Sequence, residues 1–310
     1  DRADGPPRPV GRPAPRPPLE LRPISASVTE IERWIRDPYA LHARRILKID
    51  VLDPIGGEIG ASERGMLVHD VLEAFVKSGE SVRGARALEV FTAMADAKLA
   101  AWGAFPEIVA LWRPRLTSIA TWWLEAEAAR DGLVASRRPE VKGRLTLEID
   151  GVPFTLTGRA DRIDLLHDGR ITLLDYKTGR PPSEAQVQSL LSPQLALEAA
   201  MARAGAFDGA LGFATAGRDL AEIAYLHLSG GRDGGKWEER GRSKDGRDPH
   251  ALAEAALEAL IELVRAFRRA ETGYPSRPRV QFEKAREGDY DHLARVAEWA
   301  AGESGDGGEA

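Results

Sequence analysis

Apolar residues recur at helical spacing through the first half of the chain. From Met66 to Val76 they return every three or four residues, which predicts a helix that ends near Gly79. Residues 84–130 carry the same spacing, so we expect the region of about 80–142 to be helical. Its tryptophans are more typical of a packed core than of a ligand platform. They are Trp102, Trp112, Trp122 and Trp123.

The pattern changes near residue 143, where apolar and polar residues begin to alternate. The runs 144–149, 154–166 and 170–177 are short and alternating or β-branched. Asp-Gly pairs separate them at 150–151 and 168–169, and this dipeptide favours tight hairpin turns. Three antiparallel strands are therefore predicted.

Helices and strands are expected to alternate after these hairpins. In order, we expect helices beginning at Ser183 and Ser192, strands at 209–215 and 221–228, a glycine-rich charged loop at 229–248 and an amphipathic helix at 249–272. This order predicts an α/β fold with a central mixed sheet flanked by helices, preceded by an additional N-terminal helical region.

Composition sets the two ends of the chain apart from the folded part. The first 23 residues contain eight prolines, which favour an extended chain over a packed core. We expect residues 1–23 to be a disordered linker that joins an upstream domain of a longer chain. Residues 301–310 are small and acidic and are expected to be disordered. The folded domain then covers 24–300.

Composition also excludes several kinds of chemistry. The 310 residues contain no cysteine, so no disulfide, thiolate zinc site or cysteine nucleophile can form. Any metal must be bound by oxygen or histidine nitrogen. No apolar run approaches the ~20 residues that cross a bilayer, and no signal segment opens the chain, so we expect a cytoplasmic protein. The net charge of −5 still leaves room for a basic groove.

Two polar motifs on otherwise apolar strands carry the candidate chemistry. They are G-R-A-D-R-I-D at 158–164 and L-L-D-Y-K-T-G at 173–179. A hairpin that turns at 168–169 places Asp161 beside Asp175, and Lys177 shares the face of Asp175. Paired carboxylates repel each other unless a cation lies between them, and Mg²⁺ prefers such oxygen ligands. The alternative is a surface Asp–Lys pair without a role.

These motifs resemble the signature of the RecB-like branch of PD-(D/E)XK nucleases. The resemblance extends over about 24–300 to the C-terminal nuclease domains of the AddB family, which belong to AddAB helicase–nucleases. Four further segments carry it: S-V-T-E-I-E-R-W-I-R-D-P-Y at 27–39, R-G-M-L-V-H at 64–69, S-P-Q-L-A-L-E at 192–198 and G-D-Y-D-H-L-A-R-V-A-E-W at 288–299. It implies a restriction-endonuclease-like core in which the helical region is inserted before the catalytic sheet.

The resemblance also implies roles for individual residues. The implied ligands of Mg²⁺ or Mn²⁺ are His69, Asp161, Asp175 and the backbone carbonyl of Tyr176. Lys177 is the implied catalytic lysine, and Gln194 would position Lys177 or a phosphate. Taken alone, His69 would be an ordinary core histidine and Gln194 an ordinary polar helix residue.

Two departures from the family pattern stand out. Many members bind an iron–sulfur cluster through four cysteines, but Asp37 occupies the first of these positions and 273–299 contains no cysteine. We therefore expect no cluster and expect aromatic packing to join the two ends of the domain. The candidates are Trp34, Tyr39, Tyr274, Phe282, Tyr290 and Trp299. In addition, Glu198 stands where the family often has tyrosine, and its role is open.

The expected function is metal-dependent hydrolysis of a single DNA strand, most simply as an exonuclease in double-strand break resection and recombinational repair. The implied partners are single-stranded DNA, an AddA-type helicase–nuclease subunit and an upstream helicase-like region of the same parent chain. Arg159, Arg162 and Arg180 are the first candidates for phosphate contacts. One alternative is a catalytically inactive DNA-binding or assembly module. Another is a sugar hydrolase with paired carboxylates, which has no place for Lys177 or His69.

Overall fold

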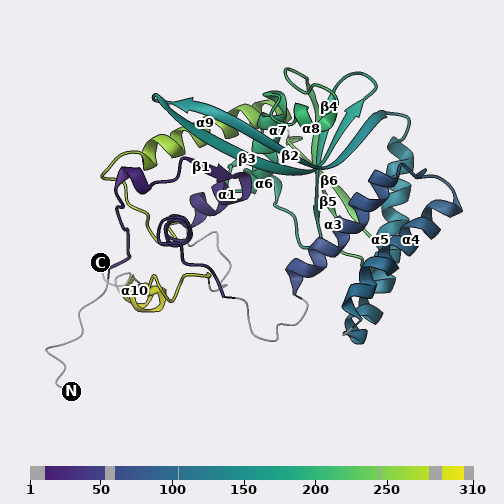
Figure 1. Ribbon diagram of the computed structural model, residues 1–310, viewed down its shortest axis with the longest axis horizontal. Helices are drawn as coiled ribbons and strands as arrows, with labels where there is room; N and C mark the ends of the chain where they lie inside the picture. The colour runs from purple at the N-terminus through teal and green to yellow at the C-terminus, as the bar shows by residue number, and fades with distance from the viewer. Residues whose placement is uncertain (1–10, 53–59, 104, 244–245, 279–287, 304–310) are drawn as a thin grey trace. The chain divides into compact units, whose positions relative to one another are not determined.

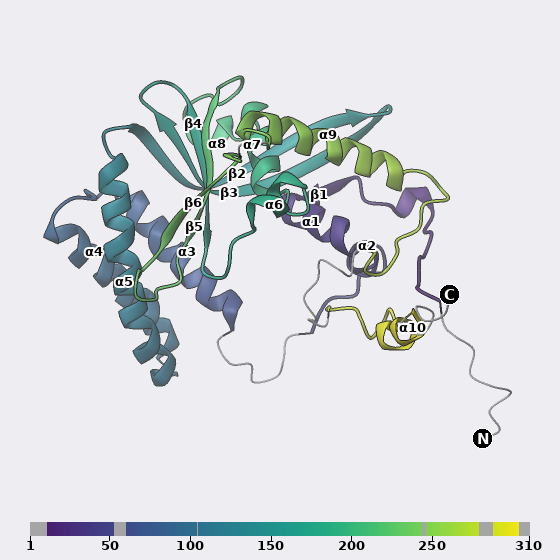
Figure 2. The ribbon, with the colours of Figure 1, turned by 180° about the vertical axis from the view of Figure 1, so that it is seen from behind.

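The computed structural model describes residues 11–52, 60–103, 105–243, 246–278 and 288–303, with side chains to residue 300. The chain divides into two compact units. Unit 1 consists of 1–53, 147–154 and 259–310, and unit 2 of 54–146 and 155–258. Figure 1 and Figure 2 show the elements of both units from opposite sides. In the part of the chain described, no helix is long and apolar enough to cross a bilayer.

A mixed sheet runs through unit 2, as predicted. Its strands are β2 (Val134–Ile149), β3 (Val152–Leu166), β4 (Ile171–Lys177), β5 (Leu220–His227) and β6 (Lys236–Arg240), of which 147–154 belong to unit 1. Among these strands the hydrogen-bonded order is β3-β4-β5-β6, and β2 pairs with β3 off this path. The pair β3–β4 is antiparallel, β4–β5 is parallel and β5–β6 is antiparallel. The predicted Asp150-Gly151 turn joins β2 to β3 with φ of 51° and 77°, as a two-residue hairpin turn requires.

Helices cover both faces of the sheet in unit 2. On one face lie α3 (Ala61–Ser78), α4 (Ala85–Leu99) and α5 (Pro106–Arg130), which Figures 1 and 2 show together beside β5 and β6. They share a core with Leu174, Tyr176 and Leu226 of the sheet, and this core includes Trp112 and Trp123. Because side chains alternate along β4, Asp175 points to the other face, where α7 (Gln194–Arg203) packs on β4 and β5.

Two short helices lie on either side of α7 along the chain. Helix α6 (Glu184–Gln188) begins with the predicted capping box between Ser183 and Gln186. Helix α8 (Asp208–Leu211) occupies part of 209–215, where a strand was predicted, so that prediction is wrong. A short apolar run does not distinguish a strand from a helical turn, and here Phe207 and Leu211 are buried as parts of a turn.

Two more boundaries differ from the expectation. Strand β2 begins at Val134 rather than near 144, so the helical region ends at Arg130. Strand β6 lies inside the predicted loop 229–248, because its charged sequence K-W-E-E-R hides the pattern of an edge strand. The long helix α9 (Pro249–Phe267) is confirmed and ends before 272.

Unit 1 contains the two ends of the chain. Its elements are the 3₁₀ turn η1 (Leu19–Leu21), β1 (Ser25–Ser27), α1 (Val28–Arg36), α2 (Pro38–Leu41), the π-helical turn η2 (His42–Ile46), the end of α9 and α10 (Val296–Glu303). Ser27 caps α1 through a capping box with Glu30. Trp34 packs on Phe267 and Tyr274 with ring centroids 5.1 and 6.4 Å away.

The aromatic residues expected to join the ends are buried in unit 1, apart from Phe282, which lies outside the described residues. The buried ones are Trp34, Tyr39, Tyr274, Tyr290 and Trp299. The predicted linker also has partners here: the carbonyls of Pro13 and Pro15 accept hydrogen bonds from the amides of Ser276 and Tyr274. Residues 1–10 of that segment and 304–310 of the predicted tail lie outside the described part, and 301–303 continue α10.

Candidate functional site

The hairpin of β3 and β4 brings two aspartates together. Arg162 pairs with Leu174 and Ile163 with Leu173, so the next pair in this register is Asp161 with Asp175. The backbone amide of Tyr176 donates a 2.7 Å hydrogen bond to Oδ2 of Asp161. The register predicted from the turn at 168–169 is therefore confirmed.

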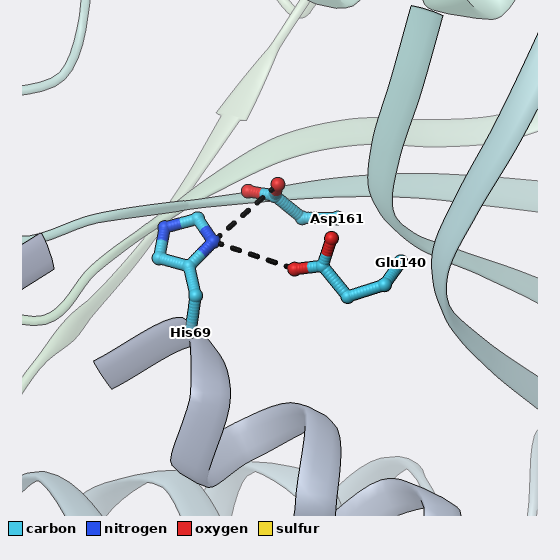
Figure 3. Close-up of side chains that lie close together, drawn as sticks. All are labelled: His69, Glu140 and Asp161. Carbon is cyan, nitrogen blue, oxygen red and sulfur yellow. Dashed lines mark ion pairs between the residues drawn. The ribbon is translucent and has the colours of Figure 1, made fainter. Parts of the chain in front are cut away.

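His69 reaches this hairpin from helix α3. Its Nε2 lies 2.9 Å from the carbonyl oxygen of Tyr176, and its Nδ1 lies 3.4 Å from Oδ1 of Asp161. A third residue, Glu140 of β2, places Oε1 3.7 Å from the same Nδ1. Figure 3 shows the imidazole directed at both carboxylates. The sequence interpretation thus placed His69 correctly beside Asp161 but missed Glu140.

A signal for Glu140 was present in the sequence. Residues 140 and 161 are equally distant from the turn at 150–151, just as 161 and 175 are equally distant from Asp168. The same argument therefore places Glu140 opposite Asp161, provided that the strand extends back beyond residue 144. Glu140 has a φ of 54°, in the left-handed region that is rare for residues other than glycine.

Asp175 lies beside this group with partners of its own. It is buried, and the ammonium of Lys177 lies 3.0 Å from Oδ1 and 2.8 Å from Oδ2. Gln194, the first residue of α7, donates from Nε2 to Oδ1 of Asp175 at 2.9 Å. The same amide nitrogen lies 3.3 Å from Oε1 of Glu198, which is also buried. Gln194 therefore joins the two carboxyl groups.

The close grouping of acidic side chains shifts the pKa values of the residues in the site. Burial acts to lower the pKa of His69, but the carboxylates of Asp161 and Glu140 outweigh it and raise this pKa to about 10. Burial raises the pKa of Asp175 to about 6, against the opposing effect of Lys177. Burial and the charges of Asp175 and Asp161 raise the pKa of Glu198 well above its usual value. Burial and the mutual repulsion of the carboxylates therefore favour protonation at this group of acids.

Comparison with protein families assigns the chain to one of them. The model of the PD-(D/E)XK nuclease superfamily matches residues 25–288. The chain belongs to the PD-(D/E)XK nuclease superfamily. Nucleases of this superfamily use divalent metals, in agreement with the donor atoms found here.

Two rickettsial proteins are similar to this nuclease over part of its length. "Uncharacterized protein" of Rickettsia bellii (strain RML369-C) is 32% identical over 175 residues, or 56% of this chain and 21% of its own. "Uncharacterized protein RC0550" of Rickettsia conorii (strain ATCC VR-613 / Malish 7) is 32% identical over 183 residues, which are 58% of this chain and 22% of the length of the relative. The chain thus spans about a fifth of the length of these curated relatives.

One solved structure, named "Crystal structure of SSO0001", is similar at 11% identity and covers 90% of this chain and 85% of its own. Its TM-score of 0.32 adds nothing to the family assignment.

The donor atoms of the nuclease fit a divalent ion. Nδ1 of His69 and one carboxylate oxygen each of Glu140 and Asp161 all lie within 4.8 Å of one another. Oxygen and imidazole donors suit Mg²⁺ or Mn²⁺, and binding displaces the proton of the imidazole. Asp175 is not part of this group of three. Its Oδ1 accepts hydrogen bonds from Lys177 and Gln194, whereas its buried Oδ2 has an ion pair with Lys177 but no hydrogen-bond partner in the described part of the chain.

Arg162 has a different role from the one expected, because it is completely buried. Its guanidinium donates to both oxygens of Glu127 at 2.8 Å and to both oxygens of Asp164 at 2.7 and 2.8 Å. A guanidinium enclosed in this way does not meet a DNA phosphate, so the prediction for Arg162 is wrong. Arg159 and Arg180, the other two candidates, are exposed.

Proposed function

We propose that this nuclease hydrolyses phosphodiester bonds of single-stranded DNA with Mg²⁺ or Mn²⁺, as the nuclease domain of an AddAB-type helicase–nuclease in double-strand break resection. One observation carries the proposal: His69 of α3, Asp161 of β3, and Asp175 and Lys177 of β4 meet at one end of the β3–β4 hairpin. The motifs that hold these residues are those that resemble the AddB family.

Each side chain has a task in this proposal. His69, Glu140 and Asp161 would hold the ion, with the carbonyl of Tyr176 beside them. A divalent ion neutralises charge on the phosphate and acidifies a bound water. Lys177 is one-third exposed and ion-paired with Asp175, so its ammonium is placed to donate a hydrogen bond to a phosphate oxygen or to the attacking water. Gln194 holds Asp175 in position.

The proposed partners follow from the resemblance over 24–300. They are an AddA-type subunit and a helicase-like region of the same parent chain, in the cytoplasm. A motor that delivers one strand to a tethered nuclease would raise the effective concentration of the substrate.

The alternative is an inactive module that only binds DNA or a partner subunit. Such a module is expected to have lost one of its catalytic groups, whereas Asp161, Asp175 and Lys177 are all present: Asp161 lies opposite Asp175 in the hairpin, and Lys177 is ion-paired with Asp175. The intact set favours the nuclease.

Cleavage of end-labelled single strands tests the proposal. Lys177→Ala and Asp161→Asn are expected to lower the rate by about 10² to 10⁴-fold in Mg²⁺ or Mn²⁺. The matched controls are Lys77→Ala and Asp168→Asn, whose side chains are exposed by 61% and 50%. Substrates blocked at the 5′ or 3′ end report polarity and exonuclease action.

Wild-type rates in both site variants would refute the assignment. A wild-type protein that binds single strands but cuts none with either metal would favour the inactive module.

A further inference from the structure

The β2–β3 ribbon carries a row of basic and hydroxyl side chains that begins at the site (strands labelled in Figure 1). Thr146 and Thr155 face each other with their hydroxyl oxygens 3.4 Å apart, which sets the pairing of the two strands about the turn at 150–151. Counting back by twos from this pair gives the facing residues on the same side of the ribbon. They are Thr146 with Thr155, Arg144 with Thr157, Lys142 with Arg159, and Glu140 with Asp161.

This face of the ribbon is open to solvent. Lys142, Arg144 and Arg159 are exposed. The intervening residues of β2 point the other way: Val141 is buried, and Gly143 lies so close to Phe207 that a Cβ there would come within 2.5 Å of its ring. The packed side and the open side of the ribbon are therefore distinct.

Two of the three positive charges on the open face have no ion pair among the described residues. Arg159 is ion-paired with Glu140. Among the described residues, no ion pair is formed by Lys142 or Arg144. On this face of the ribbon, the positions between the Glu140–Asp161 pair and Glu148 contain no acid. Side chains two residues apart on a strand are separated by ~6.8 Å, which is comparable to the spacing of phosphates in an extended nucleic acid strand.

We propose that this face, which we call the ribbon track, binds the sugar–phosphate backbone of the strand that is cut at the adjoining site. The track consists of Lys142, Arg144, Thr146, Thr155, Thr157 and Arg159. It rests on the proposed function and adds to it the path of the substrate. The track offers charges and hydroxyls but no aromatic side chain, so it holds phosphates rather than stacking bases and does not select sequence.

Binding of a fluorescent oligo-dT strand in EDTA tests the track without cleavage. The variant is Lys142→Ala with Arg144→Ala, and the control is Lys77→Ala with Arg86→Ala, which removes the same charges from exposed sites on α3 and α4. Each phosphate contact on a single strand contributes ~0.7 to the slope of log affinity against log salt, so two lost contacts lower the slope by ~1.4. Between about 50 and about 200 mM salt, the affinity of the wild type is then expected to fall about 7-fold more than that of the variant. The control is expected to match the wild type.

A cleavage assay distinguishes the role of the ribbon track from that of the site. The p-nitrophenyl ester of thymidine 5′-phosphate is a phosphodiester too small to reach the track, so the variant is expected to cleave it at the wild-type rate. With an oligonucleotide, KM is expected to rise while kcat is unchanged.

Three results would refute the proposal for the ribbon track. They are a wild-type salt slope in the Lys142→Ala, Arg144→Ala variant, an equal fall of the salt slope in the control, or a loss of cleavage of the small ester by the variant. Failure of the wild type to cut either substrate would instead count against the proposed function, and the binding experiment would still decide on the track.

Discussion

Replacement of Arg162 by methionine is expected to destabilise the nuclease without acting directly on DNA. The guanidinium is completely buried between Glu127 of α5 and Asp164 of β3, and it donates two hydrogen bonds to each. Both carboxylates are themselves fully buried. Arg162→Met therefore leaves two buried acids without their principal partner.

The loss of stability in Arg162→Met depends on which partners Glu127 and Asp164 keep. Removing one partner of a buried ion pair costs about 3–5 kcal/mol. Both acids keep other arginines, because Glu127 lies 3.1 Å from Arg137 and 3.9 Å from Arg130, and Asp164 lies 3.2 Å from Arg130. We therefore expect a loss at the lower end of this range, about 3 kcal/mol in the free energy of unfolding. The matched control is Arg170→Met, which breaks a half-exposed pair with Asp168 and is expected to cost under about 1 kcal/mol.

Unfolding in urea, followed by tryptophan fluorescence, measures the difference. A loss of about 3 kcal/mol also corresponds to a fall of about 5 °C in Tm for a chain of 310 residues. Arg162→Lys keeps the charge but not the paired hydrogen bonds and is expected to fall between the two. Wild-type stability combined with weaker DNA binding in Arg162→Met would refute the reasoning and place Arg162 on the DNA surface.

Three further substitutions test the packing and the site. Gly143→Ala places a Cβ 2.5 Å from the ring of Phe207, so it is expected to lower stability by about 1–3 kcal/mol; an unchanged urea midpoint would contradict this close contact. Glu140→Gln is expected to weaken Mn²⁺ binding by about 10–100-fold in calorimetry, whereas Glu148→Gln on the same strand leaves it unchanged; equal affinities would remove Glu140 from the metal group. Gln194→Leu releases Asp175 and Glu198 from their shared amide and is expected to lower kcat by up to about 10²-fold in protein whose circular dichroism is unchanged, and a wild-type kcat would exclude the positioning role.

Local signals determined how much of the site could be predicted from the sequence. The Asp-Gly turns at 150–151 and 168–169 set the register of their hairpins through residues that are neighbours along the chain. Asp161 beside Asp175 followed directly, and so did Lys177 on the same face. The helix that holds His69 and the capping box at Ser183 were predicted for the same reason, since spacing and caps are properties of short segments.

The tertiary structure decided what depends on distant segments. Glu140 joins the site because β2 extends back to Val134, and only its pairing with β3 makes those residues a strand. Strand β6 likewise exists because β5 pairs with it, although its own charged sequence is not typical of a strand. Arg162 lies among acids in sequence and in space, but its burial depends on Glu127, 35 residues away on α5. The turns, caps and motifs could thus be predicted from the sequence, because they depend on neighbouring residues. Packing between remote elements determined which charged side chains are buried and which face solvent.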